Sequence, residues 1–159
     1  MNTRSLGTIA LLASAALFAQ GISPAQGEEN PSFEEFPLKA RQVIVPLDGK
    51  LIPKLEAELK DATGAEIKYD VDWKSMQEPI FMLTQLDGAL KTVNEALVGI
   101  AKQPMGKETV ASKIKVIRVE NAKGEPVALK DGVLRILPTG KQWRMMKVPS
   151  TQARIKALL

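Results

Sequence analysis

The most constraining feature of the sequence is a change of hydrophobic period at Gly64. Before this glycine, in the stretch KLIPKLEAELKDATG, apolar residues recur every three or four positions, which is the spacing of an amphipathic helix. After it, polar and apolar residues alternate strictly from Glu66 to Trp73, as in a β-strand with one buried and one wet face. Glycine is the residue most often found just after a helix ends. The sequence therefore predicts a helix that leads directly into a strand.

The alternation also predicts which face of this strand carries its two aspartates. Asp70 and Asp72 lie on its polar face with Glu66, so we expect their carboxylates to point to solvent. Three carboxylates could offer oxygen ligands to a hard cation, but calcium takes about six to eight ligands, usually from a loop that contains glycine. Lys68 and Lys74 also stand close by in the sequence. We therefore predict a solvated strand face and no metal site.

Hydrophobic periodicity predicts the remaining elements. A short strand is expected at residues 42–47, another at 80–83, and a second amphipathic helix at 86–106, with Asp87 as its N-cap and Pro104 and Gly106 at its end. The C-terminal part is expected to form an antiparallel meander with strands at 112–120, 127–129, 133–137 and 142–148, and then a helix at 150–159 capped by Ser150 or Thr151.

This order of elements predicts an α+β fold, in which two main helices pack on one face of a small mixed or antiparallel sheet and a β-meander forms the C-terminal part. A single domain is expected at residues 38–149, after an acidic leader at 28–37 and before a short C-terminal helix or tail at 150–159. The expected core residues are the apolar positions of the two helices and the central strand: Leu55, Leu59, Ile67, Tyr69, Val71, Leu90, Val93 and Leu97.

Residues 1–27 have the layout of a secretory signal peptide. Arg4 supplies a positive start, and an apolar run follows from Leu6 to Ala19 that is shorter than the about 20 residues of a transmembrane helix. Two small-residue cleavage patterns come next, Ala19-Gln20-Gly21 and Ala25-Gln26-Gly27. A retained membrane anchor is the alternative. We expect an exported bacterial protein, periplasmic or extracellular, that is not an integral membrane protein after signal cleavage.

The sequence contains no histidine and no cysteine. Without histidine, the usual general base, the usual zinc ligand and the centre of a Ser-His-Asp triad are missing. Without cysteine, thiol catalysis and disulfides are excluded. A Ser-Lys pair exists at Ser112 and Lys113 but belongs to no recognisable catalytic motif. We therefore predict no catalytic residue, no metal and no cofactor.

Basic residues concentrate near the C-terminus of a chain whose net charge is +4. No acidic residue follows Asp131, whereas six basic residues do. Such an end favours an anionic partner, for example an acidic polymer or a membrane surface. The alternative is an ordinary solvated surface of uneven charge.

The segment KQWRMMKVP within this basic end is the best candidate for a partner-binding surface. Tryptophan, arginine and methionine are enriched at interface anchors, and a strand at a sheet edge can accept a strand from a partner. The alternative is that Trp143 and Met145 pack into the core. Nucleic-acid binding is not expected, because it needs a more extensive basic and aromatic surface. The predicted partner-binding residues are Trp143, Arg144, Met145, Met146 and Lys147.

Residues 42–100 resemble the short N-terminal domain shared by secretins and TonB-dependent receptors. In that family a strand leads into a Leu-x3-Leu helix closed by Thr-Gly, and a strand of the type xIxYD and a second helix with an Ala-Leu pair follow. The matching residues here are Leu55, Leu59, Thr63, Gly64, Ile67, Tyr69, Asp70, Ala89-Leu90 and Ala96-Leu97. The resemblance implies a non-enzymatic periplasmic module that contacts other envelope proteins.

Three functions are compatible with these features of the sequence. The first is an exported, non-catalytic envelope domain that acts as a protein-protein docking module. The alternative is a module that binds an anionic polymer or membrane surface through its basic C-terminal third. An enzyme of unknown type is the least expected of the three, since it would need a concave site with a perturbed acid or lysine.

Overall fold

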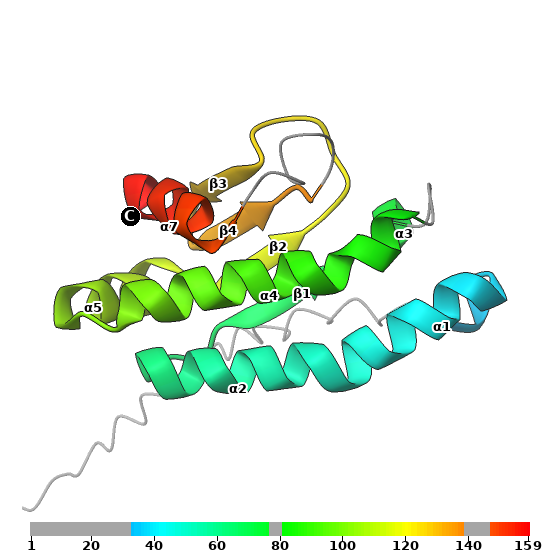
Figure 1. The fold of residues 1–159 in the computed structure, drawn as a ribbon, viewed down its shortest axis with the longest axis horizontal. Coiled ribbons are helices and arrows are strands. Elements are labelled where there is room, and N and C mark those ends of the chain that lie inside the picture. The colour runs from blue at the N-terminus through cyan, green and yellow to red at the C-terminus, as the bar shows by residue number, and fades with distance from the viewer. Residues whose placement is uncertain (1–32, 77–80, 139–146) are drawn as a thin grey trace, which may run out of the picture. The chain divides into compact units, whose positions relative to one another are not determined.

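Helices form most of the computed structural model, which describes residues 33–76, 81–138 and 147–159 (Figure 1). The α-helices are α1 (Leu38–Pro46), α2 (Ile52–Thr63), α3 (Trp73–Met76), α4 (Phe81–Ala101), α5 (Pro104–Lys113) and α7 (Val148–Leu158). A 3-10 turn, η1 (Phe33–Glu35), precedes α1, and a π-helical turn, η2 (Leu47–Leu51), joins α1 to α2. The strands are β1 (Lys68–Val71), β2 (Val116–Val119), β3 (Val127–Lys130) and β4 (Val133–Ile136). The predicted α+β class is confirmed.

The four strands form one mixed sheet in the order β1-β2-β4-β3. β1, β2 and β4 are parallel, and β3 is antiparallel to β4. The predicted antiparallel meander is therefore wrong, because β4 inserts between β2 and β3. The predicted turn between β3 and β4 is present: Asp131 and Gly132 both have positive φ, 51° and 83°, as a two-residue hairpin turn requires.

The helices α2, α4 and α7 cover the sheet, with α4 between the other two (Figure 1). Alternate residues of the inner strands point toward these helices and are buried: Ile117, Val119, Leu134 and Ile136. The opposite face of the sheet carries Asp70, Arg118 and Arg135 in adjacent register positions. The predicted arrangement with two helices on the sheet is thus extended by α7.

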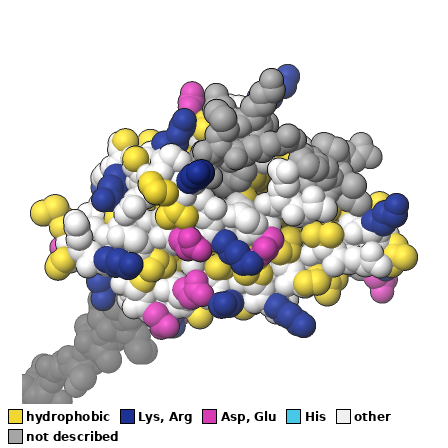
Figure 2. Space-filling view, in the orientation of Figure 1, with side chains coloured by type: hydrophobic (Ala, Val, Ile, Leu, Met, Phe, Trp, Pro, Cys, Tyr) yellow, Lys and Arg dark blue, Asp and Glu magenta, His cyan; other side chains and the backbone are white. Residues whose placement is uncertain are grey.

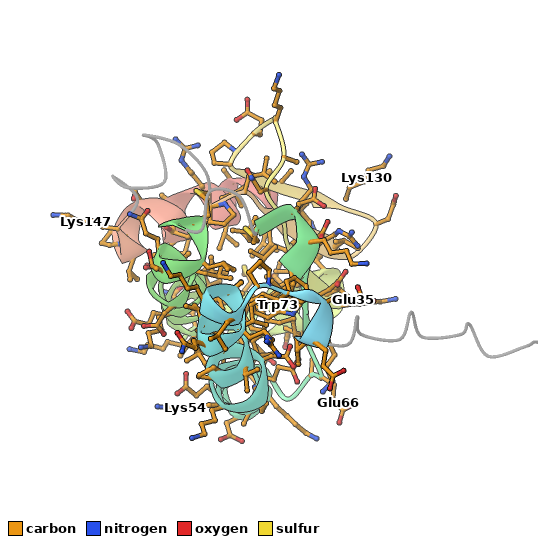
Figure 3. The ribbon with its side chains drawn as sticks, turned by 90° about the vertical axis from the view of Figure 1, so that its right-hand side faces the viewer. Glu35, Lys54, Glu66, Trp73, Lys130 and Lys147 are labelled. Atoms are coloured by element: carbon orange, nitrogen blue, oxygen red, sulfur yellow. The ribbon has the colours of Figure 1, made fainter. Side chains whose placement is uncertain are left out.

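Most of the predicted core is buried. Six of the eight expected residues are fully buried, and Tyr69 and Val71 are partly buried and pack against the same cluster. Each buried leucine of this cluster contributes about 1.5–3 kcal/mol through the hydrophobic effect. Trp73 is also buried, but it begins α3 instead of ending the strand. It points into the interior, whereas the charged residues labelled in the same view lie at the periphery (Figure 3).

The strand predicted at residues 42–47 is wrong, because this segment belongs to α1 and the start of η2. Val43, Val45 and Leu47 occupy alternate positions, but the buried positions are Ala40, Ile44 and Leu47, which have helical spacing. Val45, expected on the buried face of a strand, is 50% exposed. Tertiary packing therefore overrides the local strand preference here.

The strand predicted at residues 80–83 is also wrong where the structure describes it, because α4 already begins at Phe81. Leu83 of α4 is already buried, and it lies three residues before the predicted helix start at residue 86. Asp87 is consequently inside the helix, where it pairs with Lys91 at 2.9 Å instead of capping the N-terminus.

Helix ends near the C-terminal part also differ from prediction. α4 ends at Ala101, and Pro104 does not terminate it but occupies the first turn of α5. Only residues 116–119 of the strand predicted at 112–120 belong to a strand, and α5 continues to Lys113. Among the helices that the structure describes, none has the length and apolar character needed to cross a membrane.

The C-terminal helix is confirmed, although it begins at Val148, two residues earlier than predicted. Its N-cap is Lys147 and not Ser150 or Thr151. The Lys147 N–H donates to Ser150 Oγ at 3.0 Å, and the buried Thr151 hydroxyl donates to the Lys147 carbonyl at 3.1 Å. The strand predicted at 142–148 is therefore wrong at its last residue, and residues 142–146 lie outside the described part of the chain.

Candidate functional site

Of the five predicted partner-binding residues, only Lys147 lies within the described residues. Trp143, Arg144, Met145 and Met146 lie outside them, so their role stays a prediction. Lys147 is exposed at the start of α7. The next residue, Val148, lines a groove formed by α2, α4 and α7.

A groove of about 770 Å³ runs across α4 between α2 and α7. Three carboxylates line it, Glu58 and Asp61 from α2 and Glu95 from α4, with Lys102 as the one lysine among its lining residues. Its apolar lining consists of Ala62, Val98 and Val148. Acidic and basic side chains are interspersed near the middle of the face shown in Figure 2, where α2 and α4 lie side by side. The groove is therefore an acidic surface with apolar patches.

Helical spacing explains why these residues meet. Asp61 and Ala62 follow Glu58 by three and four positions, so all three lie on one side of α2. The same spacing relates Glu95, Val98 and Gly99 on the outer side of α4. A Cβ at Gly99 would lie 3.3 Å from Nε2 of Gln152, so the side chain of Gln152 from α7 lies against this glycine of α4. The sequence pattern indicates which residues of α2 share one side and which residues of α4 share one side. Only the packing of the three helices brings these two sides together.

A chain of hydrogen bonds lies at the bottom of the groove. Asn94, only 1% exposed, donates from Nδ2 to Glu58 Oε2 at 2.8 Å. Its Oδ1 accepts the Tyr69 hydroxyl at 3.2 Å. Asn94 thus bridges β1 and α2, and it holds one carboxylate of the groove in a defined position. The sequence contained one signal for this residue, a polar side chain four positions after Leu90 on the apolar side of the helix.

Burial raises the pKa of the Tyr69 hydroxyl, and the nearby carboxylates of Glu56 and Glu58 raise it further. Glu56 also caps the edge of β1, because its Oε1 accepts the Tyr69 N–H at 2.9 Å while its Oε2 pairs with Lys68 at 2.8 Å. The neutral hydroxyl is therefore the form that the folded protein favours.

Alkaline pH is expected to destabilise the fold through Tyr69. Because the pKa of Tyr69 is raised in the folded state, its neutral hydroxyl stabilises the fold fully below about pH 10, the ordinary tyrosine pKa. This stabilisation is lost as the pH rises above that value. Relative to Tyr69→Phe, the free energy of unfolding should fall by about 1.4 kcal/mol per pH unit there. Urea unfolding of both proteins checks this, and the absorbance of tyrosinate reports on this residue alone because it is the only tyrosine. Equal slopes for the two proteins would contradict the burial of the hydroxyl.

The aspartates of β1 have structural partners. Asp70 is exposed as predicted and pairs with Arg118 at 2.8 Å. Asp72 differs from the prediction, since it is half-buried and its Oδ1 accepts the Ser75 N–H at 3.0 Å at the start of α3. Glu66 pairs with Lys60 at 2.8 Å, and this hydrogen bond lowers the pKa of its carboxyl group. Within the described residues, no group of three or more acidic side chains is arranged to hold a metal ion.

The groove offers negative charge, hydrogen-bond acceptors and apolar contact surface in one place. These properties suit a ligand that combines positive charge with apolar groups. No family model matches the chain, and no curated protein and no solved structure is significantly similar to it.

Proposed function

We propose that the protein is an exported, non-catalytic docking module of the cell envelope. In this proposal, the groove on α2, α4 and α7 receives a cationic amphipathic segment of another envelope protein. The observation that carries the proposal is the combination of an apolar lining, Ala62, Val98 and Val148, with three carboxylates around it. The signal-peptide layout of residues 1–27 supports export in this proposal.

The carboxylates of the groove are available for a partner. Within the described part of the chain, no ion pair joins Asp61 or Glu95 to a basic residue, and Glu58 has only a long contact of 3.9 Å with Lys54. Asn94 additionally holds Glu58 in place. A preorganised acceptor loses less conformational entropy on binding than a mobile one. This favours a specific partner over diffuse attraction of cations.

An amphipathic helix is the partner element that fits best. Helix-in-groove recognition uses apolar anchors at helical spacing, which pack into an apolar groove, while charges at the rim set orientation and specificity. The apolar members of the predicted partner-binding residues, Trp143, Met145 and Met146, precede Val148 in the chain, so we assign them to the same partner. Their tryptophan and methionines would enlarge the apolar part of the interface.

Synthetic peptides test the groove directly. A labelled cationic amphipathic helix of about 18 residues, with leucines at helical spacing, is expected to bind at least about tenfold more tightly than the same peptide with glutamate in place of lysine. The double variant Asp61→Asn, Glu95→Gln should lose about tenfold in affinity for the cationic peptide, measured by fluorescence anisotropy.

A matched control removes the same charges elsewhere. Glu108 and Asp131 are exposed and lie outside the groove, so Glu108→Gln, Asp131→Asn should change the affinity by less than about twofold. Asparagine also tolerates the positive φ of residue 131. Equal losses in both double variants would show that net charge, and not the groove, attracts the peptide.

A further inference from the structure

Lysines in the two halves of the chain differ in their pairing. Residues 1–101 carry 9 basic and 14 acidic side chains, whereas residues 102–159 carry 13 basic and 4 acidic ones. Among the residues that the structure describes, five lysines form ion pairs, and all five precede residue 102. None of the eight described lysines from Lys102 onward is ion-paired with another described residue. The positive charge of the C-terminal half is therefore concentrated and largely unneutralised.

Three of these lysines surround a hollow of about 370 Å³. Lys113 comes from the end of α5, Lys115 precedes β2, and Lys130 precedes the turn between β3 and β4. Gly132 of that turn lies against the stem of Lys115, because a Cβ there would be 3.5 Å from the Cγ and Cδ atoms of the lysine. Lys130 projects outward from the sheet (Figure 3). Asp131 is the only acidic residue among those that line the hollow.

An exposed apolar residue accompanies the lysines. Leu158, near the end of α7, lines the same hollow and is 38% exposed. Lys113 donates a hydrogen bond to the carbonyl of Leu159, which ties this end of α7 to α5. Leu129 adds a second, half-buried apolar side chain. Lysines beside an exposed apolar residue are typical of proteins that bind the surface of an anionic bilayer.

We propose that this hollow and its lysines bind the phosphate groups of anionic lipid headgroups, with Leu158 entering the headgroup layer. Each basic residue close to such a surface strengthens binding about fivefold. A soluble polyanion would also attract the lysines but would make no use of Leu158, which is why the bilayer is favoured. The site shares no residue with the groove, so this proposal can fail while the docking proposal stands, and the reverse.

Vesicle sedimentation at low salt tests the lysines. The full chain should bind vesicles that contain phosphatidylglycerol, and Lys115→Gln, Lys130→Gln should weaken this binding about thirtyfold. The control Lys60→Gln, Lys91→Gln removes the same charge from ion-paired positions and should change binding less than about threefold. Vesicles of phosphatidylcholine alone measure the binding due to the apolar N-terminal residues, which all variants share. Equal losses in the two double variants, or none in either, would overturn the proposal.

A second variant distinguishes the bilayer from a soluble polyanion. Leu158→Ala should weaken binding to phosphatidylglycerol vesicles about fivefold, because less apolar surface enters the headgroup layer. The same variant should bind soluble polyphosphate as well as the wild type does. If Leu158→Ala leaves vesicle binding unchanged, Leu158 does not enter the headgroup layer and the proposal is wrong. If the wild type binds polyphosphate but no vesicles, the ligand is a soluble polyanion and the bilayer proposal is also wrong.

Discussion

Gly106→Ala is expected to lower the free energy of unfolding by about 3 kcal/mol. Alanine normally stabilises a helix by about 1 kcal/mol relative to glycine, and Gly106 lies inside α5. However, its added Cβ would lie 2.2 Å from the carbonyl oxygen of Ile100 in α4. The obstacle is backbone and not the end of a flexible side chain, so α4 and α5 would have to move apart. Urea unfolding of both proteins measures the difference.

Gly88→Ala provides the matched comparison. Gly88 lies inside α4, and a Cβ there would meet nothing within 4 Å. This variant should therefore raise the free energy of unfolding by about 0.5–1 kcal/mol, the ordinary helix-propensity gain. Opposite signs for two glycine-to-alanine changes in neighbouring helices would verify the close approach. If both variants are stabilised, α5 does not turn back on α4 as tightly as the structure indicates.

Asn94→Leu is expected to cost about 2–3 kcal/mol of unfolding free energy, although it replaces a buried polar side chain with an apolar one of similar size. The reason is that the substitution leaves two hydrogen-bond partners of Asn94 unpaired. The Tyr69 hydroxyl loses its acceptor, and Glu58 loses the amide that donates to it. A buried donor without a partner keeps its desolvation cost without a compensating hydrogen bond.

A double-mutant cycle separates this effect from a packing defect. Tyr69→Phe removes the hydroxyl, so Asn94→Leu should cost about 1 kcal/mol less in the Tyr69→Phe background than in the wild type. Urea unfolding of the four proteins gives the coupling energy. Strictly additive effects would mean that the two side chains do not share a hydrogen bond. Because Asn94 also positions Glu58, the single variant should bind the cationic peptide more weakly than the wild type does.

The two proposed surfaces use opposite charges of one chain. The acidic groove lies on α2, α4 and α7, whereas the lysine-lined hollow lies at the ends of α5 and α7 beside the hairpin turn. A module with both could rest on an anionic membrane while it presents the groove to a cationic partner. High salt should weaken both contacts, since exposed charges are screened.

Local patterns in the sequence determined several elements correctly. The helical stripe through Leu55 and Leu59, the alternation that became β1, and the turn at Asp131 and Gly132 all depend on residues close together in the chain. The end of α2 at Gly64 could also be predicted from the sequence, because the φ of 78° at this position suits glycine far better than other residues. The absence of histidine and cysteine, which the sequence shows directly, excluded thiol catalysis and the usual general base.

The tertiary structure decided what depends on residues far apart. Residues 42–47 became helical because Ile44 and Leu47 could be buried in the core, which outweighed their local strand preference. The position of β4 between β2 and β3, the role of Gly106 and the engagement of Asn94 with Tyr69 all depend on contacts that no short window contains. The same holds for the groove and the hollow, since each combines side chains from separate elements that only packing brings together.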